Sequence, residues 1–169
     1  MTMKETKFYE ITQNNSGGSF VTDDKLCHRL FIEAESYKEA VQKAEDMGCY
    51  WDGVEDGMDC PCCGDRWYRP DEVKFDGIVK KYGGYPVSKF IYNMDDATSV
   101  FKGVYEDMEW QEEPKESKKY GSTYVEGVVK LRSIEDYAQI LANMFGWEGV
   151  DSRIFYKDGS VKVISRKDY

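Results

Sequence analysis

The stretch CHRLFIEAESYKEA, from Cys27 to Ala40, decides the fold class because a strand pattern runs directly into the start of a helix. Residues 27–34 fit a strand. Ser36 follows, with Glu39 three residues later, which is the capping-box pattern of a helix N-terminus. Apolar side chains then recur at helical spacing until Gly48 ends the run: Tyr37, Ala40, Val41, Ala44 and Met47. We therefore predict a strand that leads into an amphipathic helix.

Another strand is predicted upstream of this stretch. Phe8–Gln13, FYEITQ, alternates apolar and polar residues, as a half-buried strand does. The segment NNSGG at residues 14–18 then has the composition of a turn. The N-terminal part is therefore predicted to be a strand–strand–helix unit.

The second half of the chain has the pattern of a strand–helix–hairpin unit. Strands are predicted at 87–93 and 124–131, and the charge-dense segment 106–119 is predicted to be a solvated loop or linker. Ser133 begins a second helix with one apolar face, formed by Ile134, Tyr137, Ala138, Leu141 and Phe145. A final hairpin is predicted over 154–164, around a turn that contains Gly159.

These elements predict an α+β fold of antiparallel strands with two amphipathic helices. Residues 49–87 are rich in Gly, Asp, Pro and Cys and are predicted to be mostly irregular, with one short strand at 73–75. A loop of this length inside a compact domain is expected to have a function, to be held by internal bonds, or to contain short strands that the sequence pattern does not reveal. We expect one domain over 1–169, with two lobes of about 1–70 and 87–169 as the alternative.

The composition excludes several classes of protein. Thirty-two acidic residues against 23 basic ones give a net charge of −9, which argues against binding nucleic acid directly. No apolar stretch approaches the ~20 residues of a membrane span, and the first residues lack a signal sequence, so a cytoplasmic protein is expected. The odd count of 5 cysteines argues against a disulfide scaffold. The 13 Tyr and 4 Trp suit either a homodimer interface or a core with few aliphatic side chains.

The segment CPCCG, residues 60–64, is the most local chemical signal. Cys60 and Cys63 form a C-P-x-C-G knuckle, which in zinc ribbons presents two thiolates to Zn²⁺. Four ligands close a structural zinc site, and the candidates to complete this one are Cys49, Cys62, Cys27 and His28. The alternative is a group of reduced thiols that only packs the loop. The sequence leaves both open, and no cofactor is predicted.

Catalytic motifs are missing from the sequence. A nucleophilic cysteine needs a base and an orienting group, and only Arg66 and His28 offer help. Neighbouring carboxylates such as Asp95 and Asp96 point to opposite faces of a strand and do not form a dyad. The glycine-rich segments match no phosphate-binding pattern. We predict that the protein is not an enzyme.

Two acidic stretches are the candidate surface for binding a partner. The first contains Asp52, Glu55, Asp56 and Asp59. The second places carboxylates around aromatic residues and contains Tyr105, Glu106, Asp107, Glu109, Trp110, Glu112 and Glu113. Carboxylates among aromatic side chains can bind a basic groove, with Trp and Tyr as apolar anchors. The alternative is that both stretches are loops kept soluble by their charge.

Three segments resemble small proteins of Twort-like staphylococcal phages: KFYEITQNNSGGSF at 7–20, IEAESYKEA at 32–40 and DCPCCGDRW at 59–67. The similarity covers mainly residues 7–68. It implies a phage-encoded host-takeover protein that binds the DNA polymerase III sliding clamp (its beta subunit) and fills the DNA channel as an acidic DNA mimic. The segment Gln139–Phe145 departs from the peptide that docks in the outer clamp pocket, so the channel is favoured. The alternative is a zinc-stabilised adaptor for another host or phage protein.

Overall fold

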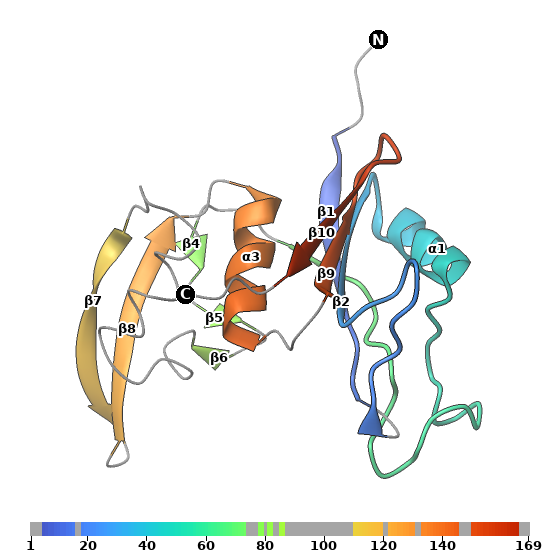
Figure 1. Ribbon diagram of the computed structural model, residues 1–169, viewed down its shortest axis with the longest axis horizontal. Coiled ribbons are helices and arrows are strands. Elements are labelled where there is room, and N and C mark those ends of the chain that lie inside the picture. The colour runs from blue at the N-terminus through green and yellow to red at the C-terminus, as the bar shows by residue number, and fades with distance from the viewer. Residues whose placement is uncertain are drawn as a thin grey trace. The chain divides into compact units, whose positions relative to one another are not determined.

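The computed structural model has the predicted α+β fold, in two units along the chain (Figure 1). Unit 1 consists of Met1–Lys74 and Trp147–Ser165, and unit 2 of Phe75–Gly146 and Arg166–Tyr169. The structure describes residues 5–15, 18–73, 78–79, 81–82, 85–86, 110–119, 122–130, 133–145 and 150–165. No helix within these ranges is both long and apolar enough to cross a membrane.

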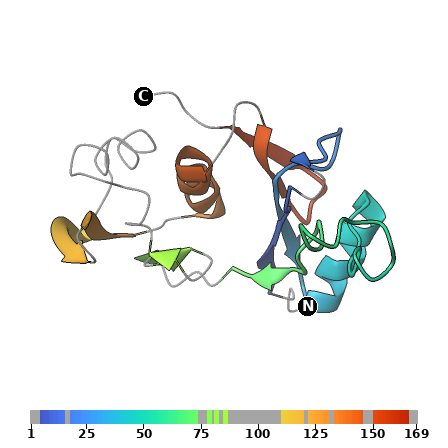
Figure 2. The same cartoon turned by 90° about the horizontal axis from the view of Figure 1, so that it is seen from below.

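Unit 1 is built on a five-stranded sheet in the order β10-β9-β2-β1-β3. Its strands are β1 (Lys7–Thr12), β2 (Arg29–Ala34), β3 (Asp71–Glu72), β9 (Val150–Phe155) and β10 (Val161–Ser165). Neighbouring strands are antiparallel except β2 and β9, which pair in parallel. Figure 2 shows the N-terminal strands in blue beside the C-terminal hairpin in red. The C-terminal hairpin is therefore part of the same sheet as the N-terminal strands.

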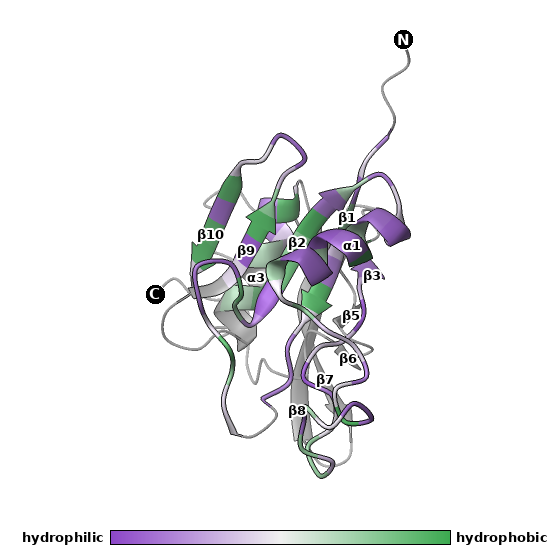
Figure 3. Ribbon diagram, turned by 90° about the vertical axis from the view of Figure 1, so that its right-hand side faces the viewer, coloured by the Kyte–Doolittle hydropathy of each residue, from purple (hydrophilic) through white to green (hydrophobic). Residues whose placement is uncertain are grey.

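Helix α1 (Tyr37–Met47) lies on one face of this sheet. The register sets Tyr9 opposite Ile32 and Ile11 opposite Leu30, so these side chains share a face. All four are buried, and the core there also includes Ala40 and Ala44 of the helix. Green segments of β1 and β2 lie beside a helix that is mostly purple on its outside (Figure 3). Alternation in the strands and helical spacing in α1 therefore form one core.

The predicted ends of α1 are confirmed. The Ser36 side chain accepts a hydrogen bond from the Glu39 N–H at 3.1 Å. The Glu39 carboxylate accepts one from the Glu35 N–H at 2.7 Å, which completes a reciprocal cap. Gly48 has φ 115° and ends the helix in the left-handed conformation, which glycine adopts without steric cost.

Unit 2 contains a three-stranded sheet, a two-stranded sheet and the second predicted helix. The strands are β4 (Ile78–Val79), β5 (Lys81–Tyr82), β6 (Tyr85–Pro86), β7 (Trp110–Lys119) and β8 (Ser122–Lys130). Their orders are β4-β8-β7 and β5-β6. Helix α3 (Ile134–Phe145) is confirmed, with the Ser133 hydroxyl accepting from the Asp136 N–H at 3.2 Å. Its residues Ile134, Ala138 and Leu141 are buried.

The prediction of a loop over 106–119 is wrong for residues 110–119. These residues form β7, which pairs with β8 in an antiparallel hairpin. The density of charged residues led to the prediction of a loop. Strands pair through backbone hydrogen bonds, however, and these do not depend on apolar side chains. The ladder changes register between Glu112 and Lys115, around Pro114, which has no N–H to donate.

Three other predictions differ from the structure in position or bounds, or concern residues outside the described ranges. The structure has a short strand, β3, at Asp71–Glu72, next to the one expected at 73–75, of which residues 74 and 75 lie outside the described residues. The strand expected at 87–93 and the residues 106–109 lie outside the described residues. The expected lobes differ from the observed units because the C-terminal hairpin, predicted within 87–169, belongs to the sheet of unit 1.

Candidate functional site

The first predicted acidic stretch forms a closed loop after α1, which we call the acidic loop (residues 52–59). The Gly53 carbonyl accepts hydrogen bonds from the N–H groups of Met58 at 2.7 Å and Asp59 at 2.9 Å. The Asp52 carbonyl accepts from the Asp56 N–H at 3.0 Å. Backbone bonds of this kind close the loop on itself and fix its shape.

Asp59 anchors the acidic loop from inside. Its carboxylate accepts hydrogen bonds from the Tyr50 hydroxyl at 2.7 Å and the Arg66 N–H at 2.8 Å. The Arg66 Nε lies 3.9 Å from the same carboxylate. Since Asp59 is buried, its charge supports the loop and is not among the exposed carboxylates.

The exposed negative charge of the acidic loop is concentrated on two residues. Glu55 and Asp56 are both exposed on its outer turn. Asp52 is also exposed, but its carboxylate pairs with Arg69 at 3.0 Å. That guanidinium also lies 5.8 Å from the centre of the Trp51 ring, a cation–π contact. Glu55 and Asp56 therefore carry the exposed charge on the outer turn of the acidic loop.

The second predicted acidic stretch lies in unit 2, and the structure describes only part of it. Tyr105, Glu106, Asp107 and Glu109 lie outside the described residues. Trp110, Glu112 and Glu113 lie on β7, where the backbone is described. Their role in binding stays a prediction.

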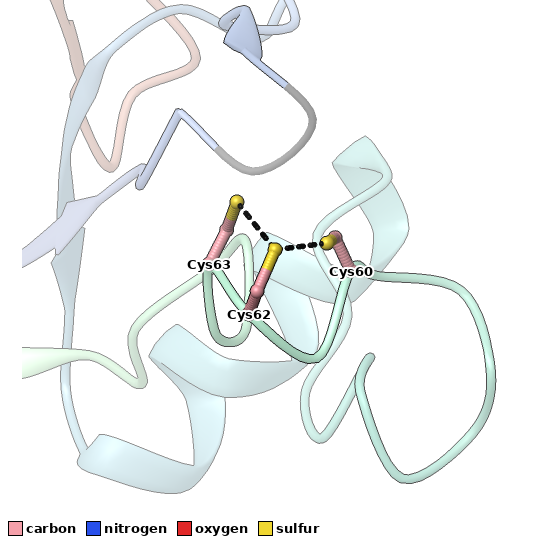
Figure 4. A group of neighbouring side chains, drawn as sticks. All are labelled: Cys60, Cys62 and Cys63. Carbon is pink, nitrogen blue, oxygen red and sulfur yellow. Dashed lines mark hydrogen bonds between the residues drawn. The ribbon is translucent and has the colours of Figure 1, made fainter.

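The two cysteines of the predicted knuckle, Cys60 and Cys63, converge with Cys62, which is one of the candidates to complete it. We call residues 60–66 the thiol loop. The Cys60 Sγ lies 2.7 Å from the Cys62 Sγ, which lies 3.6 Å from the Cys63 Sγ (Figure 4). All three sulfurs lie within 4.8 Å of one another. Cys62 and Cys63 are exposed and Cys60 is half-buried, so solvent reaches the group.

Hydrogen bonds from other segments hold the thiol loop in place. The Cys60 carbonyl accepts from the N–H groups of Cys63 and Gly64, each at 3.1 Å. The Asn14 side-chain amide donates to the Cys63 carbonyl at 2.6 Å. The Asp65 carboxylate accepts from the Val54 N–H at 2.8 Å, which ties the thiol loop to the acidic loop. The backbone that carries the three sulfurs is thus held in place by the chain itself.

The other candidate metal ligands lie elsewhere in unit 1, with Cys27 and Cys49 buried and His28 half-buried. Cys27 and Cys49 are buried in the core, and the Cys27 thiol donates to the Arg29 carbonyl at 3.2 Å. The His28 ring lies against Phe20, with ring centres 4.4 Å apart. Among the described residues, none of these three joins the group formed by the sulfurs of Cys60, Cys62 and Cys63.

Burial and sulfur contacts separate the thiols by acidity. Burial raises the pKa of Cys49 to about 12. Hydrogen bonding within the cluster acts in opposite directions on two partners: the thiol of Cys62 lowers the pKa of Cys60, while Cys60 and Cys63 raise the pKa of Cys62 to about 11. The thiolate form is therefore favoured at Cys60 and disfavoured at Cys49.

Gln13 is a supporting residue that the sequence did not reveal. Its buried side chain donates to the Cys27 carbonyl at 3.1 Å and accepts from the Arg66 guanidinium at 3.1 Å. It therefore connects the end of β1 to the thiol loop. Gln13 and Arg66 are 53 positions apart, and no local pattern predicts a contact over that separation.

The five cysteines should separate into two classes when the reduced, metal-free protein is alkylated with iodoacetamide at pH 8. We expect Cys60 to react first and Cys49 at least ~100-fold more slowly, because the thiolate is the reacting form and Cys49 is buried. Peptide mass spectrometry after timed quenching measures each rate. Equal rates at Cys49 and Cys60 would contradict the described burial.

Comparisons with known proteins give one family. A family model described as a domain of unknown function (DUF7296) matches residues 6–113, which is more than half of the chain. The match includes α1, the acidic loop and the thiol loop and ends within β7. No curated protein and no solved structure matches the chain. The chain belongs to the DUF7296 family.

Proposed function

We propose that this protein is a non-catalytic inhibitor that binds the bacterial DNA polymerase sliding clamp through exposed carboxylates. The observation that carries the proposal is the acidic loop, which holds Glu55 and Asp56 outward on a hydrogen-bonded backbone. The net charge of −9 and the resemblance to small staphylococcal phage proteins support the choice of partner. The protein would act in the cytoplasm of the host cell and stop DNA replication there.

Electrostatics makes this pairing favourable. A sliding clamp is a ring with a basic inner wall, because DNA passes through it. Carboxylates held on a fixed loop can replace phosphate charges along that wall and steer the protein into the channel. A loop that is already ordered loses little conformational entropy on binding. The binding should therefore weaken as salt screens the charges.

Neutralising the two exposed carboxylates tests the proposal. We expect Glu55→Gln with Asp56→Asn to weaken binding to a purified staphylococcal clamp about fivefold to thirtyfold at low salt, because each exposed charge contributes up to ~1 kcal/mol. Calorimetry at two salt concentrations measures the affinity, and a DNA-loading assay measures inhibition.

The matched control is Glu5→Gln with Asp24→Asn, which removes the same charge from exposed positions outside the acidic loop. This control should bind nearly as well as the unchanged protein. Equal losses in the two double variants would reject the acidic loop as the contact. Clamp loading that continues at saturating protein would reject the clamp as the partner.

The second candidate function is the zinc-stabilised adaptor for another host or phage protein. The convergence of Cys60, Cys62 and Cys63 favours bound zinc in such an adaptor. The hydrogen bonds that hold the thiol loop do not favour a fold that depends on the metal. Affinity capture from host lysate distinguishes the two functions, because recovery of the clamp supports the first and recovery of a different protein supports the second. The two functions also differ in whether removal of metal weakens the capture.

A further inference from the structure

We propose that Cys60, Cys62 and Cys63 form a three-thiolate binding site for Zn²⁺ whose fourth coordination position is left open to solvent or to an external ligand. This differs from a structural zinc knuckle in two respects: the protein supplies three ligands, and the fold does not depend on the metal. The inference does not rest on the proposed clamp binding.

The sulfur positions fit a zinc ion. Tetrahedral coordination at Zn–S distances of ~2.3 Å places two sulfurs about 3.8 Å apart. The Cys62 and Cys63 sulfurs, 3.6 Å apart, already have that spacing. The Cys60 sulfur, 2.7 Å from that of Cys62, needs to move outward by about 1 Å, within reach of a rotation of an incompletely buried side chain.

The choice of metal follows from the donors. Thiolates are soft ligands that select zinc and similar ions over Mg²⁺ and Ca²⁺, which prefer oxygen. Each thiol that binds loses its proton to the solvent, so metal uptake releases protons. With three thiolates and one neutral external ligand, the bound group has a net charge of −1.

The open fourth position follows from burial and neighbours. Cys27 and Cys49 lie in the core of unit 1, and neither they nor His28 join the sulfur group in the described part of the chain. Cys62 and Cys63 are exposed, which leaves room for a water molecule or a ligand from another molecule. Zinc sites with three protein ligands keep such a position for exchange.

The independence of the fold from the metal follows from the hydrogen bonds of the thiol loop. Asn14 holds the Cys63 carbonyl in the middle of the loop, and Asp59 holds the Arg66 N–H at its C-terminal end, so the chain itself fixes the loop. Structural zinc sites, in contrast, supply the free energy of folding themselves. The metal here would bind to a site that is already formed.

The test uses the full chain, reduced and stripped of metal, titrated with Co²⁺ as a spectroscopic probe and then with Zn²⁺. We expect one Co²⁺ per chain, a thiolate-to-metal charge-transfer band in the near ultraviolet and displacement by Zn²⁺. Cys62→Ser should weaken uptake at least ~100-fold, because it removes a direct ligand and outer-shell changes alone cost 10–100-fold. The far-ultraviolet circular dichroism of the metal-free protein should match that of the loaded protein.

Cys27→Ala and Cys49→Ala are the matched controls, and both should retain one Co²⁺ per chain with an unchanged spectrum. Loss of binding in Cys49→Ala would overturn the open site and indicate a fourth protein ligand. Unfolding on removal of metal would overturn the preformed site, and the absence of stoichiometric uptake by the reduced protein would overturn the site altogether.

Discussion

Replacing Arg29 by methionine is expected to lower the free energy of unfolding by about 3–5 kcal/mol. The Arg29 Nε lies 3.1 Å from a Glu10 carboxylate oxygen, with only 3% and 13% of the two side chains exposed. Methionine fills similar space but removes the Arg29 guanidinium from a Glu10 carboxylate that is largely buried. Chemical denaturation followed by circular dichroism measures the loss.

A double variant separates the charge effect from the loss of packing. Arg29→Met combined with Glu10→Leu removes both charges, so it should be clearly more stable than Arg29→Met alone. Lys7→Met is the matched control, because the Lys7–Glu72 pair in the same sheet is exposed, at 49% and 36% of the two side chains. Its loss should stay below ~1 kcal/mol. Equal losses in the two single variants would contradict the buried pair.

Replacing Gly53 by alanine should cost about 3 kcal/mol and displace the acidic loop. A Cβ at this position would lie 1.9 Å from an Asp59 carboxylate oxygen and 2.8 Å from the Tyr50 ring. Neither neighbour can move freely, since the Tyr50 hydroxyl and the Arg66 N–H are both hydrogen-bonded to Asp59. Denaturation measures stability, and the alkylation rate of Cys60 reports whether the adjoining thiol loop also moves.

Gly57→Ala, in the same loop, is the control for replacing a glycine at a position where the added methyl group meets no neighbour. Gly57 has φ +76°, and the space that an added methyl group would fill is open, so only backbone strain of about 1–2 kcal/mol is expected. A loss in Gly53→Ala no greater than in Gly57→Ala would show that the carboxylate contact is relieved at little cost.

Local patterns predicted the elements of unit 1 well. Ser36 and Gly48 defined both ends of α1 because capping uses groups within a few residues of one another. The hairpin formed by β9 and β10 was predicted from the turn that contains Gly159, which has φ 91°. The parallel pairing of β2 with β9 was not predicted, because it joins segments about 120 residues apart and leaves no local pattern.

In the candidate site, too, local features were predicted from the sequence and contacts between distant segments were not. The spacing of Cys60 and Cys63 indicated the knuckle and left four candidates to complete it, of which the described part of the structure brings Cys62 to the group. Its support from Asn14 crosses 49 positions and had no signal beyond a turn composition. Asp59 carries the same charge as Glu55 in the sequence, and only the fold reveals that one is buried and the other exposed.

The position of β9 between β2 and β10 has a consequence for biosynthesis. A ribosome releases β1, β2, α1 and β3 well before Val150–Phe155, so the nascent sheet has an unpaired β2 edge while all of unit 2 up to Gly146 is translated. Unpaired strand edges are sites of aggregation. Co-translational folding of unit 1 can therefore finish only after β9 and β10 have been translated, and a premature stop before residue 150 would leave that edge open permanently.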